Sequence, residues 1–305
     1  MTCRGLLSLP LIAIALLIVS CGTASTSSAG KKSIVVTYSV LGSIVKDLVG
    51  DKAVVTVLIP NGADPHEWEP SARDIELINK ADLVVENGLG LEASVQKSLE
   101  RARSAGVTFF TASDHITIRH VGQGEGVPTG DSDQAAGAPD PHLWLDPAAM
   151  KSLVGALSTE LTNDLSIDVS VEAAVLENRL YALDREIAGM VAAIPQENRK
   201  LVTGHESMGY YAERYGFKLV GVIIPGVSPQ AEVSAANLEA LEQAIQENHV
   251  RAIFTELGTS PSVAKAIGDD TGVRVVELAT HVLPDDGSYF SFLRNLTAVI
   301  TAALK

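Results

Sequence analysis

Short apolar runs rich in Val and Ile alternate with helix-like segments along most of the chain. In the first half, strands are expected at 33–39, 53–60, 81–87 and 107–112, with helices at 42–49, 71–80, 91–104 and 148–165. In the second half, strands are expected at 200–203, 219–224, 252–256 and 273–278, with helices at 207–215, 235–248, 261–271 and 289–304. Strands that are almost entirely apolar and alternate with helices predict an α/β fold with mainly parallel sheets flanked by helices.

The longest periodic segment lies between these two halves, at residues 169–194. Its apolar residues recur at helical spacing, and Pro195 ends it. At about 1.5 Å per residue such a helix is about 39 Å long, which is more than a small lobe requires. We therefore expect an N-terminal α/β lobe at 33–168, one long rigid linking helix at 169–194 and a C-terminal α/β lobe at 195–305. The alternative is a long helix that belongs to one lobe.

The first residues have the pattern of a secretory targeting segment. Arg4 precedes an apolar run at 5–19, which is shorter than the about 20 residues that a membrane-spanning helix needs. The run ends just before Cys21 in a sequence that resembles a bacterial lipobox, which implies cleavage there and lipidation of the cysteine thiol. We expect a signal peptide at 1–20 and a flexible tether, rich in small and hydroxyl residues, at 21–32. The alternatives are an ordinary signal peptide and an uncleaved anchor.

Composition and charge exclude several classes of protein. The 305 residues include 23 Lys and Arg against 37 Asp and Glu, a formal net charge of −14. Cleavage removes Arg4 and no acidic residue, so the mature charge is 22 − 37 = −15. Such an acidic chain is a poor nucleic-acid binder. Its two cysteines, Cys3 and Cys21, exclude a disulfide framework and a thiolate zinc cluster. We expect a monomer.

Two histidines occur in matching local frames. His66 lies in Asp-Pro-His-Glu-Trp-Glu-Pro (64–70), and His142 lies in Asp-Pro-His-Leu-Trp-Leu-Asp-Pro (140–147). Proline fixes its own φ angle and biases the preceding Asp towards an extended conformation, so each frame pre-organises a loop that presents an imidazole. The tryptophan offers a wall that excludes water. The repeated frame is therefore a more specific sign of a metal site than a lone loop histidine, and two unrelated loop histidines stay the alternative.

Two further histidines follow expected strands. His205 comes after 200–203, and His281 comes after 273–278. In open α/β sheets ligands bind beyond the carboxyl ends of the strands, which is where these side chains belong. The alternative is that each histidine caps a helix or forms a local hydrogen bond. Imidazole nitrogens suit zinc, copper, iron and nickel, and a site made of nitrogens points towards zinc.

The segment 115–139 interrupts the alternation of strands and helices. It is rich in Gly, Asp, Ser and Ala, and it contains His115 and His120. A loop of this length inside a compact domain is either functional or mobile. We expect a solvated loop, with transient collection of metal by its two histidines as the alternative.

Together these motifs resemble the family of metal-binding solute-binding lipoproteins of ABC transporters, which capture zinc or manganese outside the cell. The resemblance covers nearly the whole mature chain, and it rests on segments 64–71, 140–147, 203–216, 225–238, 253–272 and 289–304. It implies two α/β lobes joined by one long rigid helix, with the metal between them. It also implies a membrane permease as partner, a lipid anchor through Cys21 and a location on the outer side of the cytoplasmic membrane.

The resemblance implies that the metal ligands are His66, His142, His205 and, in fourth place, His281. The third ligand is His in zinc-type members and Glu in many manganese-type members. The fourth is usually an Asp in a Leu-Tyr-x-Asp-Ser-Leu type segment, so a histidine at position 281 departs from the pattern. Four neutral imidazoles favour Zn²⁺ over Mn²⁺. Water or a carboxylate in the fourth position stays an alternative.

Four carboxylates are candidates to offset the charge of the ion and to orient the imidazoles through their other N–H groups. They are Asp64, Asp140, Glu206 and Glu256. The expected function is capture of a divalent ion, most simply zinc, without catalysis. Because ligation needs deprotonated histidines, affinity should fall as the pH drops through about 6.5.

Three alternatives remain at this point. A manganese or iron protein of the same family differs only in its cargo. A zinc-dependent hydrolase would keep the fourth coordination position open for an activated water, with Glu206 as a nearby base. A surface adhesin is a third class, and no residue pattern in the sequence supports it.

Overall fold

The computed structural model describes Met1, residues 30–122, Glu125, residues 137–229 and residues 233–305. The predicted signal peptide, the lipidation site at Cys21 and most of the predicted tether lie outside the described residues. Among the helices of the described part, none is both long and apolar enough to cross a membrane.

The first lobe is built on a four-stranded parallel sheet. Its strands are β1 (Lys32–Tyr38), β2 (Ala53–Ile59), β3 (Leu83–Glu86) and β4 (Phe109–Thr111), in the order β2-β1-β3-β4. The helices α1 (Ser39–Val49), α2 (Ala72–Asn79) and α3 (Gln96–Ser104) connect consecutive strands. The central strand β1 is buried along most of its length, as its continuous apolar sequence predicts.

The second lobe repeats the alternation with two pairs of parallel strands. β5 (Lys200–Thr203) pairs with β6 (Lys218–Val222), and β7 (Ala252–Thr255) pairs with β8 (Arg274–Glu277). β5 also lies beside β7, so the carboxyl ends of the two pairs are neighbours. The helices of this lobe are α6 (Gly209–Tyr215), α7 (Ala235–Glu247), α8 (Pro261–Thr271) and α9 (Tyr289–Leu304).

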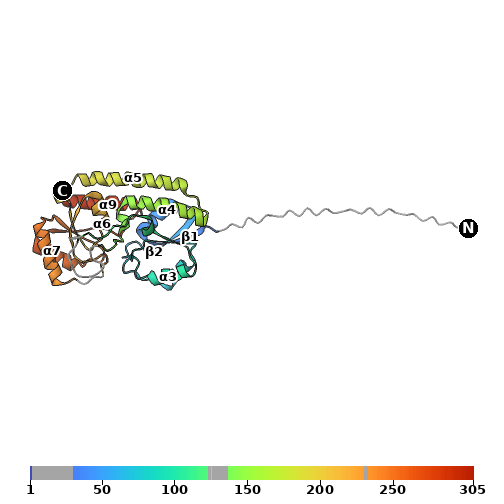
Figure 1. The fold of residues 1–305 in the computed structure, drawn as a ribbon, viewed down its shortest axis with the longest axis horizontal. Coiled ribbons are helices and arrows are strands. Elements are labelled where there is room, and N and C mark those ends of the chain that lie inside the picture. Colours follow the sequence, from blue (N-terminus) through green and yellow to red (C-terminus); the bar gives the residue numbers. More distant parts are fainter. Residues whose placement is uncertain (2–29, 123–124, 126–136, 230–232) are drawn as a thin grey trace. The chain divides into compact units, whose positions relative to one another are not determined.

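The helix α5 (Ser170–Ala192) follows α4 (Pro147–Leu165) and leads into the second lobe at β5. It packs against α4, α1 and α9, and Figure 1 shows it alongside α4 and α9. One continuous hydrophobic core contains Ile34 of β1, Leu180 of α5, Phe254 of β7 and Leu293 of α9. The two-lobed α/β fold with parallel sheets is thus the one that the sequence predicts.

Two segments differ from their expected form. The helix expected at 91–104 begins only at Gln96, because residues 89–95 form turns in which Leu89 has a φ of 57°. The segment 115–139 is partly structured where it is described, since Val121 donates a backbone hydrogen bond to Ala138 and accepts one from Gly137.

The helix start at Ser71 is confirmed, because its hydroxyl accepts a hydrogen bond from the Asp74 N–H in a capping box.

Packing along α5 generates a stability prediction. Leu180 is fully buried and Val175 is 55% exposed on the same helix. We expect Leu180→Ala to lower the free energy of unfolding by about 2–5 kcal/mol because it leaves a cavity. The matched change Val175→Ala should alter it by less than about 0.5 kcal/mol. Urea unfolding of both variants measures the difference, and equal losses would contradict the packing described here.

Candidate metal centre

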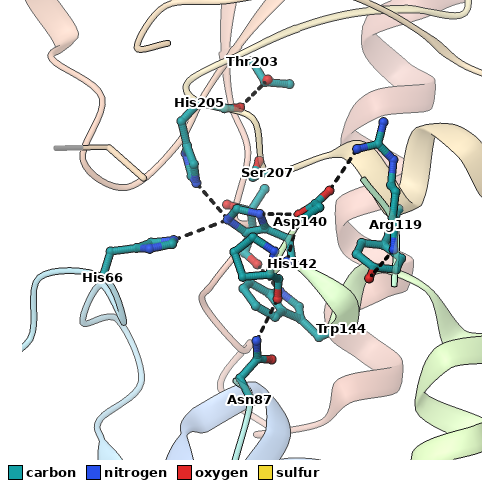
Figure 2. Close-up of polar contacts among 12 residues, drawn as sticks. His66, Asn87, Arg119, Asp140, His142, Trp144, Thr203, His205 and Ser207 are labelled. Carbon is teal, nitrogen blue, oxygen red and sulfur yellow. Dashed lines mark hydrogen bonds and ion pairs between the residues drawn. The ribbon is translucent and has the colours of Figure 1, made fainter. Parts of the chain in front are cut away.

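Four histidine side chains from both lobes meet in the interior of the protein. His66 lies in the loop after β2, His142 lies just before the 3₁₀ turn Leu143–Leu145, His205 follows β5 and His281 follows β8. All four are buried. One ring nitrogen of each histidine lies within 4.8 Å of one ring nitrogen of every other histidine in the group. Figure 2 shows His66 and His205 both directed at the same ring nitrogen of His142. The structure therefore brings together the four histidines that the sequence singled out.

The spacing of the ring nitrogens matches that of ligands around one small ion. The Nε2 atom of His142 lies 3.4 Å from His66 Nε2 and 3.1 Å from His205 Nε2. Four nitrogens at about 2.0–2.1 Å from a tetrahedral zinc ion are about 3.3–3.4 Å apart. The fourth ring also faces inward, because its centre is 5.6 Å from that of His205 and 5.9 Å from that of His142.

The Asp-Pro-His frames explain how two of these rings are presented. In each frame the Asp carboxylate accepts a hydrogen bond of 2.9 Å from the backbone N–H of the histidine two residues later. This turn is typical of Asp, and the intervening proline is compatible with it because it needs no donor. Asp140 Oδ1 also lies 2.8 Å from His142 Nδ1. Since the carboxylate accepts, the His142 proton is on Nδ1, and Nε2 presents its lone pair to the centre.

One buried carboxylate organises the other two rings. Glu256 accepts hydrogen bonds from the Gly204 N–H and from the hydroxyls of Ser207 and Thr280, at 3.0, 2.6 and 2.7 Å. Its Oε2 lies 3.6 Å from His205 Nδ1. Because Thr280 gives its only proton to Glu256, its oxygen accepts from His281 Nδ1 at 2.9 Å. This contact fixes the His281 tautomer and leaves its Nε2 free to bind a cation.

These contacts give the centre an electron-rich interior. The His281 Nε2 atom is buried, and it has no hydrogen-bond partner among the residues that the structure describes. The Nε2 atoms of His142 and His205 are 3.1 Å apart and need a proton or a cation between them, because two lone pairs repel at this distance. Neutral imidazoles are ligands for divalent transition ions, so the residues present fit such an ion.

Burial sets the protonation of the centre. It lowers the pKa of His66 and of His205 well below the usual value, and neighbouring histidines lower both further. Burial and His142 lower the pKa of His281 to about 3. These three rings are therefore neutral at pH 7 without any metal. Burial also raises the pKa of Glu256, although the Ser207 and Thr280 hydroxyls oppose this shift.

An aromatic side chain closes one side of the centre. Trp144 packs its ring against His142 and His281, with 5.3 Å between ring centres in both pairs. Its indole N–H donates to the Thr280 carbonyl at 2.9 Å, and the Tyr289 hydroxyl donates to the Trp144 carbonyl at 2.8 Å. The indole thus links the chain segment that carries His142 to the one that carries His281, and it keeps water from that side.

The other residues that the sequence suggested for the site are two carboxylates and the two histidines of the loop at 115–139. Asp64 accepts from the His66 backbone, and burial raises its pKa to about 6. The Glu206 backbone N–H donates to the Gly226 carbonyl, and Glu206 lines a small cavity with Arg119. His115 stacks on Phe110 at 4.3 Å and His120 is exposed, so neither belongs to the four-histidine cluster.

Sequence reasoning missed the neutral partners of the site. Ser207 and Thr280 hold Glu256, and the Asn87 side chain donates to the Pro141 carbonyl at 2.9 Å, which steadies the segment before His142. The signal available in the sequence was proximity, because Ser207 and Thr280 lie within two residues of histidines. Asn87 gave no such signal.

Comparison with known proteins yields consistent matches. Residues 34–303 match the family described as ZnuA, zinc-uptake complex component A, periplasmic. The chain is 30% identical over 272 residues to the high-affinity zinc uptake system protein ZnuA of Bacillus subtilis, covering 87% of this chain and 85% of that protein. It is 28% identical over 290 residues to the manganese-binding lipoprotein MntA of Halalkalibacterium halodurans, covering 92% and 91%. It superposes on the periplasmic zinc-binding protein TroA of Treponema pallidum with a TM-score of 0.78 at 26% identity, covering 90% of this chain and 99% of that one.

Because these histidine pKa values are lowered, we expect zinc affinity to begin to fall only at a pH below 6.5. Four exposed imidazoles with ordinary pKa values would together lose about four powers of ten in affinity between pH 7.5 and 5.5. Because burial holds the pKa of His66, His205 and His281 below the usual range, protons compete less at this site. We expect a much smaller loss, measured by zinc titration of the metal-free protein at pH 7.5, 6.5 and 5.5. A full loss of four powers of ten, with the fold intact by circular dichroism, would contradict this.

Proposed function

Because the chain belongs to the family of periplasmic zinc-uptake components, it is an extracytoplasmic metal-binding component of ABC metal uptake, and we propose that its cargo is Zn²⁺. In this proposal His66, His142, His205 and His281 are the four ligands. The single observation that carries it is the convergence of four buried imidazoles, each with one ring nitrogen within 4.8 Å of a ring nitrogen of the others.

The chemistry of the donors supports zinc as the cargo. Zinc accepts tetrahedral sets of imidazole nitrogens, whereas manganese favours carboxylate and carbonyl oxygens. The described contacts place carboxylates behind the rings, with Asp140 on His142 Nδ1 and Glu256 close to His205 Nδ1. Carboxylates in these outer positions offset the charge of a divalent ion and strengthen the rings as ligands. They leave the inner donors all nitrogen.

Manganese and iron are the alternatives within the family. Relatives are named for zinc uptake and for manganese binding, so membership alone does not select the ion. The argument for zinc rests on His281, whose tautomer is fixed by Thr280 so that Nε2 is available. In this proposal His281 takes the position where the resembling family usually has an Asp.

The same geometry argues against a hydrolase. Members of the family are solute-binding components of transporters rather than enzymes. A catalytic zinc site keeps one position open for an activated water. Here one ring nitrogen of the buried His281 lies within 4.8 Å of a ring nitrogen of each of the other three histidines. A tetrahedral ion held by four rings has no such position.

Delivery requires an anchor and a partner. Relatives are named as lipoproteins, which agrees with the lipobox-like sequence before Cys21. We propose that the mature chain is a monomer tied through Cys21 to the outer face of the cytoplasmic membrane. Its partner is the membrane permease of an ABC transporter, to which it brings the ion.

Competition between ions tests the choice of cargo. We expect the metal-free mature protein to bind Zn²⁺ at least about a hundredfold more tightly than Mn²⁺, because its inner donors are imidazoles. Titration of each ion against a chromophoric chelator gives both dissociation constants. Elemental analysis of protein purified from metal-balanced medium gives the ion that is bound in the cell. Tighter binding of manganese would overturn the proposal.

Substitution of the fourth histidine tests the ligand set. We expect His142→Ala to weaken zinc binding by more than about a hundredfold, beyond the cost of losing an outer partner. His281→Ala should weaken it less, because three rings remain. His281→Asp should bind zinc and should narrow the preference for zinc over manganese, since it adds an oxygen donor.

His115→Ala is the matched control, because His115 stacks on Phe110 outside the cluster. Its zinc affinity should equal that of the unaltered protein. If His281→Ala also binds zinc with unchanged affinity, His281 is not a ligand and the four-nitrogen site is wrong.

A further inference from the structure

A buried arginine lies directly behind one of the proposed ligands. The Arg119 side chain is only 7% exposed, and its Nη1 lies 3.2 Å from Oδ2 of Asp140. The other oxygen of the same carboxylate, Oδ1, accepts from His142 Nδ1 at 2.8 Å. Figure 2 shows the resulting chain from Arg119 through Asp140 to His142. One carboxylate thus joins a fixed positive charge to a ring at the centre.

Further contacts hold the arginine in place. Its Nη2 pairs with Glu125, and its Nε lies 3.4 Å from Glu213 Oε2. Its backbone N–H donates to the Tyr210 hydroxyl at 2.9 Å, and its carbonyl accepts from the Asp140 N–H at 2.9 Å. Main-chain and side-chain contacts therefore bind Arg119 both to Asp140 and to α6, the helix that follows His205.

The start of α6 leaves room for this ion pair. Gly209 is the first residue of α6, and any Cβ atom there would overlap Arg119 Nη1 and Asp140 Oδ2. The φ angle of Gly209 is not positive, so the backbone itself does not demand glycine. The need for glycine arises from the closeness of the arginine–aspartate pair. The pair and the helix start are thus fitted to each other.

We propose that Arg119 is a positioning residue for metal capture, which holds the Asp140 carboxylate so that His142 presents its Nε2 atom to the ion. The inference rests on the proposed function, because it assumes that His142 binds the ion. Asp140 is fully buried, and a buried carboxylate without a cationic partner is unfavourable. Without Arg119 the carboxylate would turn towards other donors or admit water, and His142 would lose its fixed orientation.

The test uses the mature, metal-free protein with zinc as the probe. Dissociation constants come from competition with a chromophoric chelator, and Co²⁺ absorption reports the geometry of the bound ion. We expect Arg119→Met to weaken zinc binding by about tenfold or more, as for other outer partners of metal ligands, and to alter the cobalt spectrum. Arg119→Lys should recover part of the affinity, because it keeps the charge but lacks the planar fork. Gly209→Ala should act in the same direction, because it separates the pair without removing a charge.

A double-substitution cycle separates positioning from general stability. If Arg119 acts through Asp140, Arg119→Met should cost little further affinity in an Asp140→Asn background. The control is Arg294→Met, which removes an arginine paired with Glu186 at 2.8 Å and should leave zinc affinity unchanged. Circular dichroism checks that each variant is folded.

Two outcomes overturn the inference. Zinc affinity that is unchanged in folded Arg119→Met would remove its role, and so would losses from Arg119→Met and Asp140→Asn that simply multiply. Failure of the proposed function looks different, because the unaltered protein would then bind no zinc or His142→Ala would bind it normally.

Discussion

The structure depends on the close mutual approach of ring nitrogens from four buried histidines. Contacts of 3.1 and 3.4 Å between Nε2 atoms are repulsive for neutral rings with both protons on Nδ1. A cation at the common point makes the same arrangement attractive. The outer partners of the rings favour this arrangement. Asp140 and Thr280 each fix a proton on Nδ1 of a histidine, so that the Nε2 atom of that histidine can bind a cation. The centre is therefore prepared for a metal by its hydrogen bonds.

The negative charges near the centre lie behind the histidine rings and not among the inner donors. Burial keeps three of the rings neutral by lowering the pKa of His66, His205 and His281. The negative groups stand behind them as Asp140 and Glu256, both buried and both hydrogen-bonded. In the proposed site a divalent ion would meet imidazole nitrogens first and carboxylates second. This order favours zinc by ligand type while it still supplies a counter-charge.

The sequence predicted the architecture and the meeting of the four histidines, but not the network around them. Strand and helix periods are local properties, so β1 and α9 could be predicted within one residue. The predicted start of α3 was wrong, because Leu89 adopts a positive φ and the turns continue to residue 95, whereas the helix was expected to begin at Leu91. The role of Arg119 was hidden for another reason. Its partners Asp140, Glu213 and Tyr210 are distant in sequence, and only the tertiary fold brings them together.

The shared hydrophobic core has a mechanical consequence for the way cargo is exchanged. The second lobe has an apolar cluster of its own around Val202 and Ile253, but a larger cluster runs from β1 through α5 to β7 and α9 and is shared by both lobes. Rotating the lobes apart as rigid bodies would expose that shared cluster to water, which costs about 25 cal/mol of free energy for each Å² of apolar surface exposed. The segments that follow β2 and β8 are tied to each other by two hydrogen bonds between Asn61 and Leu283. A route that keeps the shared cluster buried is a local rearrangement of the segments that carry the histidines, with the body of the molecule acting as a fixed frame.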